Sequence, residues 1–431
     1  MIKIFKLSPI LVVMLFTYFT SEAQLTIKAE LRPRAEFRNG FKTLKEDGDK
    51  PAFFIEQRSR LYFNFKKERF ELHLALQDIR IWGGTDQIYK SDPALTNIYE
   101  GYIRYHFNDK YSLKFGRQAL DYNNARFFGN LDWAQQGRSH DALLFIYDDE
   151  NTQSQLHVGA AFNQNVFEPA QLFGTFYQNS NYKTMQYAWW NKKLTDANIS
   201  LLIQNDGRQV QADTSIAYRQ TYGMIGDFKL GNVKLDGEVY YQGGKNGGNT
   251  DVSAFLLALH ATAKAGQIPL TLGFELLSGT SIDDSKDKAF NPLYGTNHKF
   301  YGFMDYFYVG NGHGQAPSSS GLMDIFLKAN YKTGDKSSLL AFAHVFNSPA
   351  KIYDPESGFT ESMSSYLGTE IDLVYKLIVS KDAVFNVGYS HMFASTTMET
   401  IKGRGDSSKT HNWAWVMFAF KPTLFTTKKD E

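Results

Sequence analysis

Apolar and charged residues alternate strictly along the first part of the chain. In residues 26–38 (TIKAELRPRAEFR), every second position from Ile27 is apolar or proline, and every position from Lys28 to Arg38 between them carries a charge. A period of two places successive side chains on opposite faces of a β-strand. The segment is therefore predicted to be a strand with one apolar face and one ionic face.

The same period recurs along the whole chain, and no amphipathic run of helical period and length competes with it. In residues 58–65, for example, Arg58, Arg60 and Tyr62 alternate with Leu61 and Phe63. The pattern predicts eighteen strands. They are 26–38, 57–66, 70–80, 97–107, 111–118, 140–147, 155–162, 182–191, 196–205, 217–227, 232–242, 252–263, 268–278, 322–332, 337–346, 365–377, 382–391 and 411–420.

The connections between these strands alternate in length. Tight turns such as 66–69 and 108–110 alternate with long segments such as 39–56 and 279–321. An even number of strands with short and long connections in turn is typical of outer-membrane barrels. In lipid the sheet must close, because no backbone N–H or C=O group can stay unpaired there. The apolar row would then face lipid and the ionic row would face a water-filled lumen.

A soluble β-sandwich or a lipocalin-like barrel would show the same alternation with the opposite polarity. The polar rows carry too many ions for the core of a closed soluble barrel. The strands also run to about ten residues, as expected of membrane strands, whereas soluble strands average nearer six. The predicted fold is all-β, an 18-stranded antiparallel transmembrane β-barrel forming a monomeric pore.

The two ends of the chain differ from the barrel region. Residues 1–23 combine a basic start, a short apolar run and small residues at Ser21 and Ala23, which predicts a signal peptide cleaved after Ala23. The barrel is expected to occupy residues 24–420, and a polar C-terminal tail follows at 421–431. The predicted location is the outer membrane of a Gram-negative bacterium. The absence of cysteine suits passage through an oxidising compartment.

Charge distribution is more informative than net charge. With 46 basic and 45 acidic residues, the net charge is +1, but eleven of the 14 arginines precede residue 140. Arginines clustered on one side of several strands would create a fixed positive field; surface solubility is the alternative reading. Aromatic residues make up 15% of the chain although the mean hydropathy is −0.37, which fits strands bounded by aromatic girdles.

Catalytic and metal-binding patterns are weak. No HExxH, Walker or GxSxG motif occurs. His344 lies on an apolar row with Phe342 and Phe346, where an interfacial position or an error in the assigned register is a better explanation than a catalytic role. The acidic cluster at 283–287 does not match the spacing of a calcium loop, and a solvated loop explains it better. We therefore expect no enzyme activity, no cofactor and no metal.

Several stretches closely resemble the alginate export porin family. The resemblance implies an 18-stranded barrel whose basic lumen passes an anionic polysaccharide. The matching stretches are RSRLYFNF (58–65), LQDIRIWG (76–83), FGRQAL (115–120), FFGNLDWAQQGRSHDA (127–142) and FNPLYGTNHKFYGFMDYF (290–307). Where the family usually has an acidic pair before GNLDW, this chain has Asn123-Asn124-Ala125-Arg126, which makes the loop more basic.

The resemblance and the alternation together give a set of candidate substrate-binding residues. The resemblance implies Arg58, Arg60, Arg80, Arg117 and Arg138. The alternation alone adds Arg32, Arg34 and Arg104. The loop at 119–139 is expected to fold inward or to cap the mouth, which adds Arg126 and Asp132. Acidic side chains would hold these arginines apart and orient them, and they include Glu30, Glu36 and Glu100 as well as Asp132.

The predicted function is an outer-membrane porin with an arginine-lined lumen that passes anionic oligo- or polysaccharide such as alginate-like uronates. Guanidinium groups hold carboxylates by paired hydrogen bonds, and many weak sites in sequence let a polymer slide. A general or small-anion porin remains the alternative, and an outer-membrane enzyme or adhesin is a more distant one. The expected partners are the anionic polysaccharide or small anions, outer-membrane lipid and periplasmic secretion proteins, but no nucleic acid.

Overall fold

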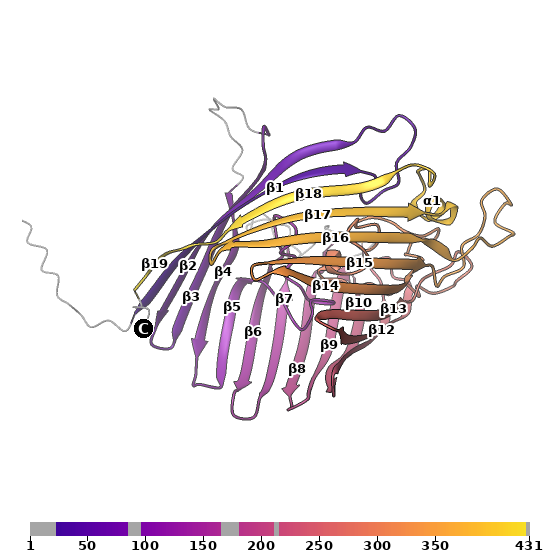
Figure 1. The fold of residues 1–431 in the computed structure, drawn as a ribbon. Coiled ribbons are helices and arrows are strands. Elements are labelled where there is room, and N and C mark those ends of the chain that lie inside the picture. The colour runs from indigo at the N-terminus through magenta and orange to yellow at the C-terminus, as the bar shows by residue number, and fades with distance from the viewer. Residues whose placement is uncertain (1–22, 85–95, 165–180, 211–214, 428–431) are drawn as a thin grey trace, which may run out of the picture.

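A computed structural model describes residues 23–84, 96–164, 181–210 and 215–427 as a closed antiparallel β-barrel (Figure 1). Eighteen long strands pair with their neighbours in chain order, and β1 also pairs with β18, which closes the sheet. The predicted fold class and the number of long strands are confirmed. The predicted signal peptide, apart from Ala23, lies outside the described residues.

The strands are longer than predicted at many ends because pairing continues past the apolar part of each strand. Their bounds are β1 (Gln24–Asn39), β2 (Ala52–Lys67), β3 (Phe70–Ile81), β4 (Thr96–His106), β5 (Tyr111–Gln118), β6 (His140–Asp149), β7 (Ser154–Phe162), β8 (Thr184–Lys193), β9 (Ala197–Gln209), β10 (Ile216–Leu230), β11 (Val233–Lys245), β12 (Asp251–Ala265), β13 (Ile268–Leu277), β14 (Leu322–Gly334), β15 (Ser337–Asn347), β16 (Tyr366–Ser380), β17 (Ala383–Ala394), β18 (His411–Phe420) and β19 (Thr423–Thr426).

Within the described ranges, two short helices lie in the long connections. The 3₁₀ helix η2 covers Asn297–Lys299, and α1 covers Thr396–Lys402. The Ser395 side chain accepts a hydrogen bond from the backbone N–H of Met398, and Gly403 ends the helix with a φ of 68°, so both ends of α1 are capped. No helix among the described residues is long and apolar enough to span a membrane.

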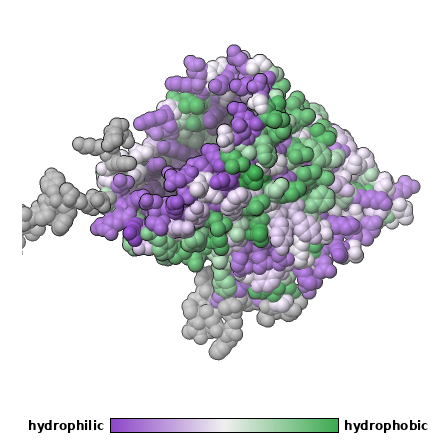
Figure 2. Space-filling model, turned by 90° about the horizontal axis from the view of Figure 1, so that it is seen from below, coloured by the Kyte–Doolittle hydropathy of each residue, from purple (hydrophilic) through white to green (hydrophobic). Residues whose placement is uncertain are grey.

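The two faces of the barrel differ in polarity as predicted. On β1, Leu31 and Phe37 are exposed on the outer face, whereas Glu30 and Arg32 are buried on the inner face. On β12, Phe255 and Leu259 are exposed in the same way. Figure 2 shows hydrophobic residues in a band across the outer surface, with hydrophilic residues on both sides of it. Such a band matches the hydrocarbon core of a bilayer.

Residues beyond β18 continue the closure of the barrel. The chain breaks its pairing at Lys421 and Pro422, where the backbone N–H of Ala29 donates to the Pro422 carbonyl at 3.0 Å. β19 then pairs with the start of β1, with Thr426 opposite Thr26. The segment predicted as a polar tail therefore includes a strand. This strand covers an edge of β1 whose backbone groups would otherwise lack partners.

The inner face near β14–β16 is partly aromatic, and this corrects the interpretation of His344. His344 was predicted at an interface, but it is 1% exposed and faces the interior, where its Nδ1 lies 2.8 Å from Asp324 Oδ2. Its row is apolar because Phe346 packs against Phe307 of a long connection that enters the barrel, with ring centroids 5.0 Å apart. On this side the core of the barrel, not the lipid, covers the aromatic row.

Candidate functional site

Two long connections enter the lumen. The first inward loop is residues 119–139, between β5 and β6, and the second inward loop is residues 278–321, between β13 and β14. The first loop contacts Ser200 on β9, Glu275 on β13 and Arg58 on β2. These strands lie on different sides of the closed sheet, so this loop crosses the lumen. The predicted inward fold of residues 119–139 is confirmed.

One wall of the lumen carries an arginine cluster, which we define as Arg32, Arg34, Arg38, Arg58 and Arg60 on β1 and β2. The antiparallel register places Arg32 directly opposite Arg58, and Glu30 opposite Arg60. Directly opposed like charges destabilise a strand pair unless other groups compensate them. The compensation comes partly from the strands themselves and partly from the first inward loop.

The first inward loop supplies acceptors to the deepest members of the cluster. Arg58 is fully buried, and its Nη2 donates to Glu30 Oε1 at 2.6 Å and to Asp132 Oδ1 at 2.7 Å. Arg32 donates to the Asp132 carbonyl at 2.6 Å and to Gln135 Oε1 at 2.9 Å. Burial alone would raise the pKa of Asp132, but the charges of Arg58 and Arg32 hold it below its ordinary value. Asp132 therefore remains ionised at neutral pH.

Arg60, Arg34 and Arg38 complete the cluster. Arg60 donates to Gln77 Oε1 at 2.9 Å and lies 3.6 Å from the ring centre of Tyr99. Arg34 and Arg38 share the Glu36 carboxylate at 2.8 and 2.9 Å, and Arg34 also pairs with Glu56. Five guanidinium groups thus face four carboxylates, those of Glu30, Glu36, Glu56 and Asp132. Many of the other acceptors of these arginines are neutral carbonyl and amide oxygens. The arginines exceed these carboxylates by one positive charge, and Lys421, whose Nζ lies 3.4 Å from Glu30 Oε1, adds another.

A second part of the lumen wall, formed by strands between β11 and β16, is acidic. Its carboxylates come from β11, β13, β14 and β16, and they are buried. They are Glu238, Glu275, Asp324, Glu370 and Asp372. Arg126 of the first inward loop forms ion pairs with this wall. Its Nη1 and Nη2 each lie 2.6 Å from a Glu275 oxygen, and its Nη2 lies 3.4 Å from Glu238. The loop therefore bridges the two walls, with an acid on the basic side and a base on the acidic side.

Arg126 is charged in this setting. Its burial disfavours the charged form, but Glu275, Tyr301 and Glu238 raise its pKa well above the ordinary value. The ring of Phe300 lies 3.7 Å from the guanidinium carbon and adds a cation–π contact. A bidentate arginine–carboxylate pair of this kind, held by two hydrogen bonds, has a fixed geometry. It therefore fixes the position of the loop against the acidic wall.

The second inward loop packs on the first and is anchored to the acidic wall. The backbone N–H of Met304 donates to Glu370 Oε1 at 2.7 Å. The two loops meet where Trp133 stacks on His298 at 4.4 Å and where the Gly129 N–H donates to the Tyr294 carbonyl at 2.9 Å. A Cβ at Gly129 would lie 2.2 Å from Thr296 Oγ1, so only glycine permits this approach. Together the two loops form a constriction inside the barrel.

The family model for alginate export matches residues 23–414. The chain belongs to the alginate export family. Together with the apolar outer band, this membership places it in the outer membrane of a Gram-negative bacterium as a channel of the porin type. No curated protein matched the chain.

Solved structures with a similar fold are outer-membrane proteins of Pseudomonas. OccK9 (OpdG) of Pseudomonas aeruginosa has a TM-score of 0.62 at 10% identity, over 93% of this chain and 98% of that one. A BenF-like porin from Pseudomonas fluorescens Pf-5 has a TM-score of 0.60 at 12% identity, over 93% and 99%. OpdK of Pseudomonas aeruginosa, in a structure with vanillate, has a TM-score of 0.58 at 9% identity, over 92% and 99%. At these identities the likeness concerns the fold.

The structure brings together five of the candidate residues of this alginate export family member. Arg32, Arg34, Arg58 and Arg60 face the lumen beneath the first inward loop, with Asp132 among them. Arg126 lies in the first inward loop, as Asp132 does, but it contacts the acidic wall. These five arginines are at most 5% exposed, because loop groups or wall carboxylates already occupy them.

Arg138 and Arg104 lie elsewhere inside. Arg138 Nη1 donates to the Gly295 carbonyl at 2.9 Å and so links the two inward loops. Burial lowers its pKa. Arg104 lies near the end of β4 that adjoins a tight turn, and its Nε donates to Ser112 Oγ at 2.9 Å. Arg104 is therefore separate from the arginine cluster.

Two predicted lumen positions are wrong. Arg117 shares the outer face of β5 with Phe115, which is 50% exposed, and it pairs with Asp141 at 3.1 Å. Gln77 on β3 faces the lumen, where it bonds to Arg60. Arg80 is an odd number of residues further along the same strand, so its side chain lies on the outer face, where it pairs with Asp78 at 2.7 Å. In both cases the period of two along the strand turns the side chain away from the lumen.

Sequence reasoning missed the acidic wall, and it placed Arg38 on the ionic row of residues 26–38 but left it out of the candidate residues. Asp324 and Glu370, for example, lie on the polar rows of their predicted strands. The alternation within one strand does not show which strands bring their acidic residues to the same side of the lumen. Among the described residues, no group of three or more histidine, aspartate or glutamate side chains could hold a metal ion.

Proposed function

We propose that this channel passes anionic saccharides, with uronate oligomers or polymers as the substrate class. The arginine cluster at the constriction carries this proposal. Its arginines exceed the paired carboxylates by one positive charge, and several of its hydrogen bonds go to neutral carbonyl groups. Membership of the alginate export family supports the same substrate class.

The mechanism is an exchange of acceptors. Arg32 and Arg60 donate mainly to carbonyl and amide oxygens of the strand and of the first inward loop. A substrate carboxylate is a stronger acceptor than these groups, because charge-assisted hydrogen bonds are roughly twice as strong as neutral ones. A passing carboxylate therefore replaces loop oxygens one at a time, and the loop oxygens return behind it. Arg38 is the first contact, since its side chain is 33% exposed while Arg34 and Arg58 are covered.

A small-anion porin is the second candidate. The observation in its favour is that both inward loops cross the lumen between the basic and acidic walls, which leaves less room for a polymer than an unobstructed barrel would. One solved barrel of similar fold is described with vanillate. In this case the arginine cluster would exchange its loop oxygens for the single carboxylate of a small anion.

Planar-bilayer recording distinguishes the two candidates. We expect the reversal potential in a salt gradient to show anion preference, and we expect uronate oligomers to interrupt the current more strongly than neutral oligosaccharides of equal length. Block that increases with oligomer length supports a saccharide channel, whereas equal block by single carboxylates supports a small-anion porin. Cation preference would contradict both.

The matched variants are Arg38→Gln and Arg117→Gln. Both remove one arginine from the same part of the barrel, but Arg38 faces the constriction and Arg117 faces outward. Arg38→Gln should weaken both anion preference and uronate block, and Arg117→Gln should change neither. An equal response of the two variants would show that overall charge, and not the cluster, sets the selectivity.

A further inference from the structure

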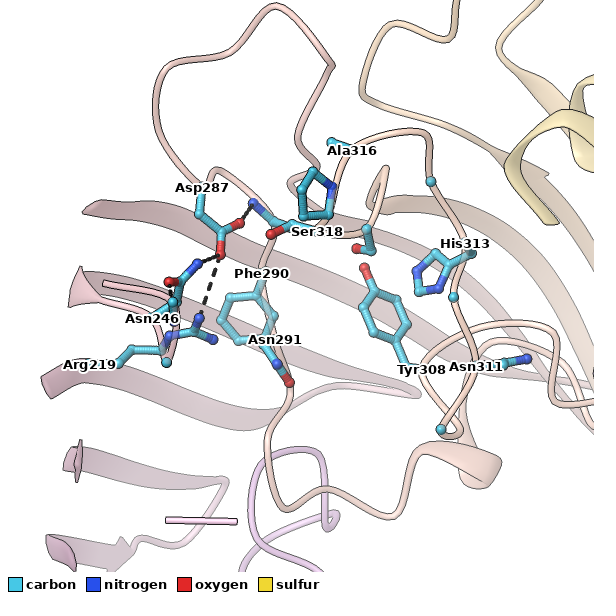
Figure 3. A pocket seen from close by; sticks show the side chains of 18 of the residues that line it. Arg219, Asn246, Asp287, Phe290, Asn291, Tyr308, Asn311, His313, Ala316 and Ser318 are labelled. Carbon is cyan, nitrogen blue, oxygen red and sulfur yellow. Dashed lines mark hydrogen bonds and ion pairs between the residues drawn. The ribbon is translucent and has the colours of Figure 1, made fainter. Parts of the chain in front are cut away.

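A separate cavity lies at the mouth of the barrel, away from the arginine cluster. It has a volume of about 600 Å³ and lies between the second inward loop and the ends of β9–β11 that adjoin long connections. Figure 3 shows side chains from both parts around it, among them Arg219, Asn246, Asn291 and Tyr308. Cavities of roughly 300–1,000 Å³ hold small ligands in proteins.

The charges around this cavity are balanced. Arg208 Nε donates to Asp206 Oδ1 at 2.9 Å, and Arg219 Nη2 lies 3.6 Å from Asp287 Oδ2. Asp287 also accepts from Asn246 Nδ2 at 2.9 Å and from Thr280 Oγ1 at 3.2 Å. Burial lowers the pKa of His313 to about 3, so this side chain is neutral at physiological pH. The described lining thus offers polar groups without an uncompensated charge.

Several buried polar atoms in the lining lack a hydrogen-bond partner among the described residues: Arg219 Nη1, Tyr308 Oη and both ring nitrogens of His313. The charged donor among them is Arg219, which is 7% exposed. Leaving a buried donor unsatisfied costs about 1–3 kcal/mol, and more for a charged group. The cavity is far larger than the roughly 30 Å³ that one water occupies in the liquid. Arg219 Nη1 therefore points to a ligand with an acceptor oxygen.

The chain also leaves room for a ring in this cavity. Gly310 and Gly312 line the cavity, and a Cβ built at either would meet no atom within 4 Å. The rings of Phe290 and Tyr308 supply apolar surface on the same lining. A ligand that fits has a flat apolar face and several hydroxyl groups at its edge, because hydroxyls both donate and accept hydrogen bonds.

We propose that this cavity binds one neutral sugar ring, a hexopyranose unit. A hydroxyl oxygen accepts from Arg219 Nη1, neighbouring hydroxyls bond the amides of Asn246 and Asn291, and the aromatic rings cover the C–H face. A carboxylated sugar fits less well, since it brings a charge that no lining cation is free to balance and places it near Asp287. The site is thus distinct in chemistry from the arginine cluster, and the proposal does not depend on anion passage.

Calorimetry on the purified protein in detergent tests the site with methyl glycosides of glucose, mannose and galactose as probes and with glucuronate as the charged counterpart. At least one neutral glycoside should bind with a lower Kd than glucuronate. Arg219→Met should raise that Kd about tenfold or more, as expected for loss of one charged hydrogen bond worth at least ~1.4 kcal/mol. Gly312→Leu should abolish binding by filling the cavity while leaving Arg219 in place.

Arg404→Met is the control, because Arg404 lies between α1 and β18 and pairs with Glu46 and Asp49 away from the cavity, so that the variant removes one arginine without touching the lining. Its affinity should equal that of the unaltered protein. Absence of neutral glycoside binding, tighter binding of glucuronate, or full binding by the Gly312→Leu variant would each overturn the proposal. Anion selectivity recorded in the same samples separates this result from the proposed function, since Arg219→Met should leave it unchanged.

Discussion

Arg126 offers the sharpest test of the constriction. Replacing it with methionine keeps an unbranched apolar stem and removes the guanidinium group with its charge. The change breaks two hydrogen bonds of 2.6 Å to Glu275 and the contact at 3.4 Å with Glu238, and it leaves both carboxylates buried without their cation. The first inward loop then loses its anchor on the acidic wall while it keeps the anchor at Asp132.

The size of the effect follows from burial. The side chains of Arg126 and Glu275 are 0% and 2% exposed, and removing one partner of a buried ion pair costs about 3–5 kcal/mol. The lumen admits water once the loop moves, so the lower end of this range applies. A loss of ~3 kcal/mol shifts the balance between anchored and released loop by roughly 150-fold. Release should therefore become frequent enough to observe.

Single-channel recording measures this release as a higher and noisier conductance. Hydrogen exchange of residues 119–131 should increase in parallel, while the strands keep their protection. Arg117→Met serves as the control, because it removes an arginine from the outer face and should leave the trace unchanged. If Arg126→Met showed native conductance and native exchange in the loop, the reasoning that this pair holds the constriction would be refuted.

Four further outcomes can be tested. Asp132→Asn should raise conductance by loosening the loop from Arg58 and Arg32, which single-channel recording checks. Burial opposes ionisation of Asp132, but these arginines keep its pKa below the ordinary 3.8. The ionised anchor is therefore complete above pH ~4 and is lost as the pH falls through the lowered pKa. Conductance should stay level from neutral pH down to ~4 and rise below it, and the Asp132→Asn variant should lack this rise. Deleting residues 421–431 should lower the temperature at which the barrel unfolds, measured by its mobility on gels with and without heating, because β19 pairs with β1. Arg80→Gln should leave ion selectivity unchanged, since Arg80 faces outward.

The period of two was sufficient to predict the strands but not their ends. β2 was predicted from residue 57, yet it begins at Ala52, because residues 52–55 (AFFI) are apolar on both faces and show no alternation although they pair with β1. Helix α1 has seven residues, too few to show a helical period. Its stability comes from the caps at Ser395 and Gly403 and from contacts with distant segments, none of which the local pattern reveals.

The candidate site was predicted in part. Alternation correctly placed Arg32, Arg34, Arg58 and Arg60 inside, since polar rows face the lumen. The resemblance alone suggested Arg117, whose parity with Phe115 on the same strand points it outward. Which groups neutralise the arginines depends on the path of residues 119–139 through the barrel, and contacts more than a hundred residues apart fix this path.

The closure of the barrel has a consequence for the order of its assembly. β1 completes its pairing only with β18, where Asn39 meets Asn412, so the first strand made must wait for the last. Such long-range pairing forms slowly, and until it forms, β1 keeps a row of open backbone groups that cannot enter hydrocarbon. Entry into the bilayer is therefore coupled to completion of the polypeptide, and a chain that stops before β18 has no stable membrane-inserted form.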